Sequence, residues 1–405
     1  MNTGDPFAGK ARALLFIALA QVLALSVWFA GAAALPGLIA AGDLSPARQA
    51  ALTSAVQIGF VAGALASAIY GLPDRIDPRR VFACGAVIAA LANIAALALE
   101  PGSAAMIATR FAAGAALALA YPVGMKLAAS WARGDTGFLV GLLVGALTLG
   151  SALPFAFNLA ETGPGWQMPF LVSALAALAA SGLILLAAGG PGLRPAPPFR
   201  PGAALLAFRD PALRLANLGY LGHMWELYAM WAWIAPFAHA YWSARNGSPL
   251  AADLTAFAVV AAGAIACLAA GLLADRLGRT AVTMAAMAVS GSCALAAGLV
   301  FGLPPWLMLT VLLIWGMAII ADSAQFSAAI AELAPPERTG TLLTLQTALG
   351  FALTAIMVQL LPFWIGWAGW QWAFAPLAIG PFLGVWAMGR LRARPEAARL
   401  AGGRR

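Results

Sequence analysis

Three charged side chains lie deep inside long apolar runs: Arg110, Glu226 and Asp322. At the centre of a membrane helix each charge costs roughly 2.5–3.5 kcal/mol, so such a residue normally faces a cavity or a partner. A guanidinium opposed by carboxylates can bind an anion and a proton together. We therefore expect these three side chains to carry the chemistry of the protein.

Each charge has a predicted role and a rival one. Arg110 is predicted to bind an anionic group of a substrate through its bidentate fork, although a permanent salt bridge to a neighbouring helix would also explain it. Glu226 is predicted to carry proton coupling, because a buried carboxylate is costly when charged and far less so when protonated. Asp322 is the second candidate. His223, one turn from Glu226, either relays the proton or neutralises that carboxylate.

Aromatic and amide side chains in the same runs are candidates for substrate contact. Trp225 and Tyr228 lie in the seventh run, Gln325 lies one turn beyond Asp322, and Trp28 lies in the first run. The alternative is that the rings only fill space beside glycine-rich helices. We expect Trp225, Tyr228, Gln325 and Trp28 to contact the substrate.

The sequence offers no arrangement for catalysis. With two histidines, no paired cysteine ligands and no G-x-x-x-x-G-K loop, neither a metal site nor ATP hydrolysis is expected. No nucleophile stands beside a base, as covalent catalysis requires. We expect no enzyme activity, no cofactor and no metal. Energy would come from an ion gradient, most simply of protons.

Composition assigns the broad class. Residues are 62% hydrophobic and 9% charged, against about 25% charged in soluble domains. No soluble fold of this length could hide so much apolar surface, so the chain is predicted to be an integral membrane protein. The net charge of +8 arises from short loops and the tail, without interleaved base-stacking aromatics. No nucleic-acid partner is therefore expected.

The chain repeats itself at about half its length. Ordered markers at one offset indicate a tandem duplication. The matched pairs, 201, 203 and 204 positions apart, are Asp74-Arg75 with Asp275-Arg276, Thr136-Gly137 with Thr339-Gly340, and Gly165-Trp166-Gln167 with Gly369-Trp370-Gln371.

Runs of about twenty apolar residues cross a bilayer as helices. Twelve such runs lie at roughly 13–40, 48–71, 79–100, 103–127, 136–160, 168–190, 213–242, 252–274, 281–301, 305–330, 340–363 and 368–391. Proline stiffens an extended path, so the Pro- and Arg-rich residues 191–212 are predicted to be a cytoplasmic linker. We expect a six-helix bundle over 1–190, a second over 213–391 and a basic tail over 392–405.

Lysine and arginine predict the orientation. With both ends inside, the segments between spans on the cytoplasmic side carry nearly all basic residues, and the opposite side carries only Arg48 and Arg245. Both termini are therefore predicted to be cytoplasmic. We expect a monomer in a bacterial-type inner (plasma) membrane.

One charged turn carries a recognisable pattern. Gly271, Asp275, Arg276, Gly278 and Arg279 fit G-x-x-x-D-R-x-G-R in full. With its six plus six helices and basic central linker, the chain resembles the major facilitator superfamily of secondary transporters over nearly its whole length. The resemblance implies an all-α membrane fold of twelve transmembrane helices, arranged as two six-helix bundles related by pseudo-two-fold symmetry.

The other family patterns are met less well. Arg110-x-x-x-Gly114 resembles a second, looser motif. In the first copy of the charged turn, Asp74 and Arg75 match, but other residues stand at both glycine positions. At Asp74 a latch and a plain turn are therefore equally expected.

The resemblance also implies where function resides. In this family helices 1, 4, 7 and 10 line a central cavity, and Arg110, Glu226 and Asp322 fall on that set. The turn at Asp275 is expected to latch neighbouring helix ends by charge–dipole attraction. Such a latch would favour the conformation closed toward the cytoplasm.

Three functions fit these features. The first is proton-coupled uptake of a small anion bound through Arg110. The second is proton-coupled efflux of drugs or amphipathic metabolites, although Ala146 and Leu149 interrupt the exporter pattern G-x-x-x-G-P-x-x-G-G at residues 141–150. The third is a transport-inactive receptor or scaffold, which would usually carry a long soluble domain. We expect uptake, with a small molecule, protons and the lipid bilayer as partners.

Overall fold

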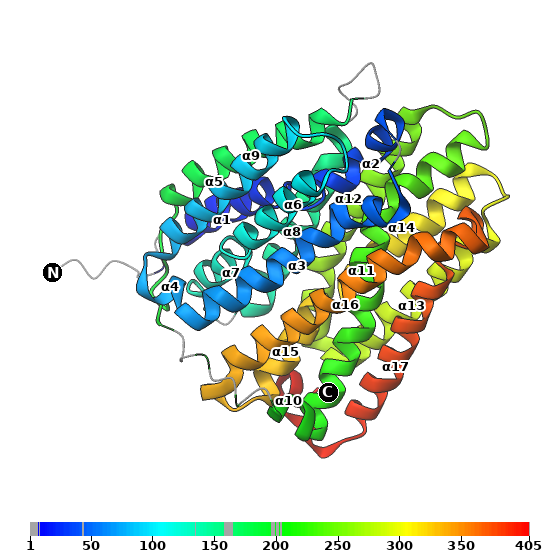
Figure 1. Cartoon of the computed structure of the whole chain (residues 1–405). Coiled ribbons are helices and arrows are strands. Elements are labelled where there is room, and N and C mark those ends of the chain that lie inside the picture. The colour runs from blue at the N-terminus through cyan, green and yellow to red at the C-terminus, as the bar shows by residue number, and fades with distance from the viewer. Residues whose placement is uncertain are drawn as a thin grey trace.

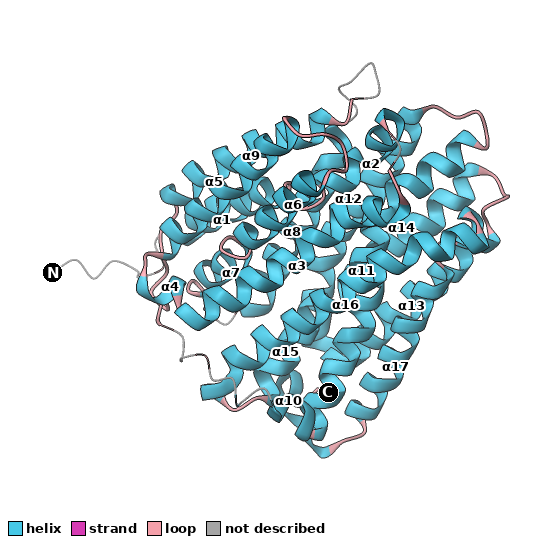
Figure 2. Ribbon diagram, viewed as in Figure 1, coloured by secondary structure: helices cyan, strands magenta, loops and turns pink. Residues whose placement is uncertain are grey.

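The computed structural model describes residues 7, 9–42, 44–133, 135–157, 165–195, 199, 202 and 205–404, apart from the side chains at positions 136, 137 and 275. The elements in this part of the chain are helices joined by short loops, with no strand among them (Figure 2). A membrane offers backbone groups no water to bond, and a helix satisfies them internally.

The amino-terminal half forms one bundle. Its helices α3 and α5 begin with proline behind a side-chain cap, from Ser45 and Asp77 respectively, which starts a helix sharply. Helix α3 packs on α6, and α5 packs on both α6 and α9. The elements are α1 (Lys10–Leu25), α2 (Ala30–Ala41), α3 (Pro46–Tyr70), α4 (Leu72–Arg75), α5 (Pro78–Leu97), α6 (Ala104–Leu117), α7 (Tyr121–Ala129), α8 (Thr136–Phe157) and α9 (Gln167–Leu186).

The carboxy-terminal half repeats this arrangement. Helix α11 packs on α16 and α17, and α12 and α13 both pack on α14. Its α-helices are α10 (Leu206–Arg209), α11 (Pro211–Ser243), α12 (Pro249–Leu277), α13 (Arg279–Leu299), α14 (Pro305–Ala321), α15 (Ser323–Leu333), α16 (Thr339–Ala368) and α17 (Ile379–Arg392). Its 3-10 segments are η3 (Pro336–Arg338), η4 (Trp370–Trp372), η5 (Ala375–Ala378) and η6 (Pro395–Gly403).

The two bundles lie side by side (Figure 1) and meet along α8 with α12 and along α3 with α16. The internal repeat is visible in their packing. A Cβ at Gly114 of α6 would overlap the carbonyl oxygen of Val56, and a Cβ at Gly316 of α14 would overlap that of Val259. Both contact partners recur about 200 positions later, so the same helix pair approaches closely in each half because glycine stands there.

Eleven helical segments in the described residues are long and apolar enough to cross a membrane. The twelfth predicted span is α11, which is 33 residues long. It falls short of that hydropathy because it carries His223, Glu226 and several tryptophans and tyrosines. Positions 196–198, 200, 201, 203 and 204 of the predicted linker lie outside the described residues. The short helix α10 (Leu206–Arg209) and the start of α11 at Pro211 fall within its range.

Three of the predicted spans are interrupted within the run, and a fourth, 368–391, begins with the 3-10 segments η4 and η5 before α17. The runs 13–40, 103–127 and 305–330 are interrupted between α1 and α2, between α6 and α7, and at Asp322 between α14 and α15. Irregular backbone at membrane depth is tolerated only where protein or a cavity surrounds it. These three breaks therefore lie toward the interior of the molecule.

Candidate functional site

A cavity of about 700 Å³ lies between the two bundles. Helices α3, α7 and α8 line it from one half, and α11, α15 and α16 line it from the other. The volume falls within the roughly 300–1,000 Å³ of ligand pockets. Most of the wall is apolar, and five aromatic side chains contribute to it: Phe60, Tyr121, Tyr220, Tyr228 and Phe351.

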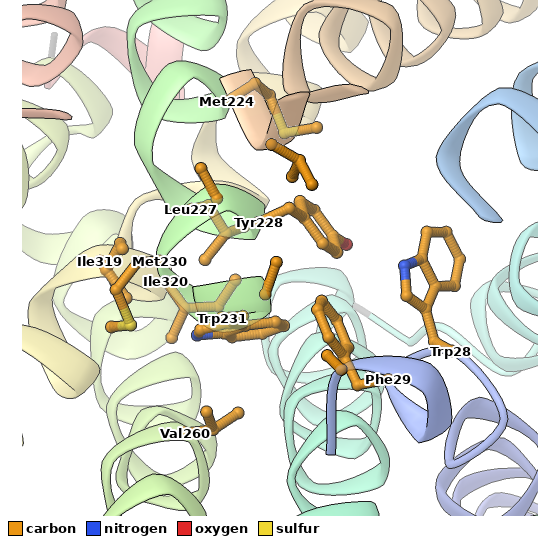
Figure 3. Packing of buried hydrophobic residues seen from close by; sticks show 14 of the residues in the cluster. Trp28, Phe29, Met224, Leu227, Tyr228, Met230, Trp231, Val260, Ile319 and Ile320 are labelled. Atoms are coloured by element: carbon orange, nitrogen blue, oxygen red, sulfur yellow. The ribbon is translucent and has the colours of Figure 1, made fainter. Parts of the chain in front are cut away.

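Aromatic side chains from both halves pack together at one end of this cavity. Figure 3 shows Trp28, Phe29 and Tyr228, which belong to this group. Trp28, in the turn between α1 and α2, packs against Phe60, Tyr228 and Phe351 with ring centroids 4.8, 5.7 and 5.2 Å apart. Phe29 stacks on Tyr228 at 5.9 Å. These rings form a seal that joins the first half of the chain to the second.

The other end of the cavity is open. Ala129 and Ala331 line it there and are exposed. Beyond the aromatic seal, Gln359 Nε2 donates to Ser54 Oγ at 2.8 Å and links α16 to α3. The open end lies on the side where α1 begins and α17 ends (Figure 1), which we call the terminal side. The molecule is therefore open toward its terminal side and closed on the opposite side.

An ion pair lies at the mouth of the cavity. Arg279 donates from Nε and Nη2 to the two oxygens of Glu332, at 2.8 and 2.5 Å. Its Nη1 donates to Gln325 Oε1 at 2.8 Å. The tail joins this cluster, since the backbone N–H of Ala401 donates to Glu332 Oε2 at 3.0 Å and Leu400 is fully buried.

The same connection recurs in the first half with its charges exchanged. Asp74, in the turn after α3, pairs with Lys126 of α7. Asp74 and Arg279 lie 205 positions apart, and Lys126 and Glu332 lie 206 apart. In each half, therefore, the charged turn is tied to the terminal-side end of the helix that lines the cavity. The sequence showed both lysine and glutamate near helix ends, but not what they would bind.

The charged turn after α12 is shaped by its glycines. Gly278 has φ of 94° and joins the end of α12 to the start of α13, a backbone conformation that favours glycine. Gly271 is buried, whereas the side chains of Arg276 and, in the first copy, Arg75 are exposed. The side chain of Asp275 lies outside the described part of the structure, so the latch predicted for it stays a prediction.

Arg110 is fully buried within the first bundle and does not line the cavity. Its guanidinium donates to Asn93 Oδ1 of α5 and, from Nη2, to the carbonyl oxygen of Val27 at 2.7 Å. It also lies over the ring of Phe170, 5.3 Å from the centroid. Val27 lies in the break between α1 and α2, and its carbonyl also accepts a longer bond from the backbone N–H of Ala30 at 3.4 Å. Arg110 thus adds a charged donor to the backbone at this break.

Glu226 has a related position in the second bundle. Its Oε1 accepts from Trp315 Nε1 at 2.7 Å and its Oε2 accepts from Ser290 Oγ at 2.6 Å. Trp315 stands 205 positions after Arg110. Helices α6 and α14 therefore occupy matching positions in the two halves. Arg110 of α6 donates to the first span, and Trp315 of α14 donates to α11, the counterpart of that span in the second half. Glu226 is buried and does not line the cavity.

His223 lies beside Asp322 and not, as the relay hypothesis required, against Glu226. His223 Nδ1 is 2.8 Å from Asp322 Oδ1, within ion-pair distance but without hydrogen-bond alignment, and the two carry opposite charges only when His223 is protonated. Both side chains are almost fully buried. The pair lies close to the cavity wall, because the ring of Tyr220, which lines the cavity, packs against His223 with centroids 6.1 Å apart. Asp322 itself occupies the break between α14 and α15.

The structure separates the aromatic and amide candidates. Tyr228 and Gln325 line the cavity. Trp28 lies one layer behind the wall, in the seal. Trp225 faces away, toward a separate surface groove between α11 and α16, where its Nε1 donates to the carbonyl of Pro376 at 2.9 Å. No group of three or more metal-ligating side chains occurs among the described residues.

Two repeated bundles of membrane-length helices around one central cavity define a secondary transporter fold. The family model of the Major Facilitator Superfamily matches residues 17–321, and the chain belongs to this family. It is accordingly a multi-pass membrane protein that acts as a transporter and not as an enzyme. No curated protein matches the sequence.

Solved transporter structures share the fold at low sequence identity. A D-xylose–proton symporter is 17% identical with a TM-score of 0.74, over 96% of this chain and 99% of that chain. The human organic anion transporter MFSD10 is 16% identical with a TM-score of 0.68, over 94% and 99%. The nucleoside transporter NupG is 13% identical with a TM-score of 0.71, also over 94% and 99%.

Proposed function

We propose that this transporter carries an amphipathic solute with an aromatic or apolar body, bound in the cavity between the bundles. The observation that carries this proposal is the wall of the cavity, whose floor and sides are formed by phenylalanine, tyrosine and aliphatic side chains. Such a wall gains free energy from apolar surface removed from water, about 25 cal/mol per Å², and from stacking against aromatic rings. Few charged groups face the solute.

The geometry favours this substrate class over the small anion expected from the sequence. That expectation depended on Arg110, whose guanidinium instead donates hydrogen bonds to Asn93 and to the carbonyl of Val27 in the helix break. The cation that does line the described cavity is Arg279, and Glu332 already holds it in a bidentate ion pair. An anion would have to displace a carboxylate of the protein itself.

For the coupling ion we propose the proton, bound at the pair of Asp322 and His223. Three observations support this pair over Glu226. It lies next to cavity-lining residues, it occupies a helix break, and His223 Nε2 has no partner among the described residues. Both oxygens of Glu226, in contrast, accept hydrogen bonds. A group that must gain and lose a proton in every cycle needs a route to the cavity.

The orientation is also a proposal. The excess of lysine and arginine between spans on the terminal side favours placing that side in the cytoplasm. The open end of the cavity would then face the cytoplasm. We still expect a monomer in a bacterial-type inner membrane. The two bundles of one chain enclose the cavity between them, so a second copy is not needed to form it.

The test uses purified protein and a panel of chemically distinct probes: phosphate, benzoate, D-xylose, uridine and ethidium. Ethidium, an amphipathic aromatic compound, is expected to raise the melting temperature most. Stabilisation by phosphate or D-xylose alone would contradict the proposal. Ethidium movement in proteoliposomes should then follow an imposed pH gradient, and a protein that binds ethidium but never moves it would be a receptor.

Coupling is tested by Asp322→Asn in the same proteoliposomes. The variant should still exchange ethidium between compartments at equal pH, but it should no longer concentrate ethidium against a gradient. Glu337→Gln, which neutralises an exposed carboxylate away from the cavity lining, is the matched control and should behave as wild type. Gradient-driven accumulation by Asp322→Asn at the wild-type level would remove Asp322 from the coupling mechanism.

A further inference from the structure

We propose that Arg279 is a positioning residue for substrate recognition: it orients the Gln325 amide so that its N–H groups face the cavity. Among solutes with the same apolar body, the cavity would then favour those that carry a hydrogen-bond acceptor. This inference rests on the proposed function above and adds a polar preference to it. It links the charged turn, which the sequence associates with conformational change, to the choice of solute.

The orientation of the amide follows from the chemistry of its partner. A glutamine side chain has one accepting and one donating end, and a guanidinium can only donate. Arg279 Nη1 lies 2.8 Å from Oε1 of Gln325, so the oxygen must be the end that faces Arg279. The Nε2 end then points elsewhere. It has no acceptor among the described residues, and Gln325 lines the cavity.

Arg279 is itself held firmly in place. Its other two donors bind the two oxygens of Glu332 side by side, the geometry in which arginine and carboxylate are most rigid. Ala401 donates its backbone N–H to the same carboxylate. A flip of the Gln325 amide would bring its N–H groups against these donors. The flipped state is disfavoured, because it would lose a hydrogen bond to a charged group.

The remaining uncharged polar side chains on the wall do not discriminate in this way. They are hydroxyls of tyrosine, serine and threonine, including Tyr121, Tyr220 and Thr347, while Arg279 and Glu332 bind each other. A hydroxyl rotates and can either donate or accept, so it suits both kinds of solute. Among the uncharged polar side chains that line the described cavity, Gln325 therefore sets the preference between donors and acceptors.

Two bicyclic aromatic probes of similar size separate these cases. The ring nitrogen of isoquinoline only accepts, and the N–H of indole only donates. Wild-type protein should bind isoquinoline about fivefold more tightly than indole, the effect of one net hydrogen bond of about 1 kcal/mol. Gln325→Leu should bind both probes equally. Gln325→Glu keeps an acceptor for Arg279 and presents a second one to the cavity, so its preference should reverse toward indole.

The positioning role has its own test. The double variant Arg279→Gln with Glu332→Gln removes the ion pair without leaving a buried charge unpaired. It should bind the two probes within about twofold of each other although Gln325 is intact. Arg276→Gln, an exposed arginine on the same turn, is the control and should keep the wild-type preference. A purely structural Arg279 would lower the melting temperature of the double variant and leave its preference unchanged.

Two failures are distinguishable. If both probes bind wild type equally, or if Gln325→Leu keeps the preference, the inference is wrong while an aromatic-binding cavity remains. If neither probe binds and D-xylose or phosphate stabilises the protein instead, the proposed substrate class is wrong and the inference fails with it.

Discussion

Replacement of Arg110 by methionine separates a substrate-binding arginine from a structural one. Methionine keeps the aliphatic stem, but it lacks the guanidinium that lies over Phe170 and donates no hydrogen bond. Asn93 Oδ1 and the carbonyl of Val27 then lose a charged donor. Each such bond contributes about 1.5–3 kcal/mol. Because the variant no longer buries a charge, part of this loss is offset, and we expect a net destabilisation of about 2–4 kcal/mol.

The assay is thermal unfolding in detergent, followed by tryptophan fluorescence, for which the 14 tryptophans provide ample signal. Arg110→Met should melt several degrees below wild type, and the folded fraction should bind ethidium within about twofold of wild type. Arg80→Met, at an exposed position, is the control for loss of an arginine as such. An unchanged melting temperature together with lost ligand binding would refute the structural role and restore Arg110 as a substrate ligand.

Further predictions concern the other ionisable groups. Glu226→Gln leaves one of its two donors facing an amide N–H, so it should lower the melting temperature but keep accumulation driven by a pH gradient; normal stability with lost accumulation would make Glu226 the coupling site. Asp74→Asn breaks a partly exposed ion pair worth about 0.2–1 kcal/mol, and a double-mutant cycle with Lys126→Gln should return that coupling energy or less. Asp135, outside the spans, accepts hydrogen bonds from the Arg133 backbone and Lys10, which lower its pKa. Its stabilisation is therefore present above the unfolded pKa near about 3.9 and is lost as the pH falls through the folded value, so the difference in melting temperature between Asp135→Asn and wild type should shrink in acid.

The fold could be predicted from the sequence because its causes are local and repeated. A run of about twenty apolar residues specifies a membrane helix whatever its neighbours are. The recurrence of Asp74-Arg75 as Asp275-Arg276 indicated where the first half of the chain ends and the second begins. The helix breaks could not be predicted in this way. The bond from Arg110 to Val27, for example, joins residues 83 positions apart, and no periodicity within either run encodes it.

The candidate site was predictable only in part, for the same reason. The charges of Arg110, Glu226 and Asp322 mark buried polar contacts, and each does have buried partners. Sequence does not say whether such a contact faces a cavity or another helix. Hydrophobicity also hides sites: Tyr121 and Tyr220 line the cavity, but a tyrosine in an apolar run looks the same whether it contacts a solute or fills space.

The carboxyl-terminal tail has a practical consequence for anyone who purifies this protein. Ala397 and Leu400 are fully buried, and Ala401 is bonded to the carboxylate that holds Arg279. An affinity tag or fluorescent protein fused directly after this segment is expected to disturb the bond from Ala401 to Glu332, and through it the position of Arg279 at the cavity. A fusion ahead of Lys10, or a long flexible spacer after the tail, should leave ligand binding undisturbed, and activity compared between the two fusions would reveal the difference.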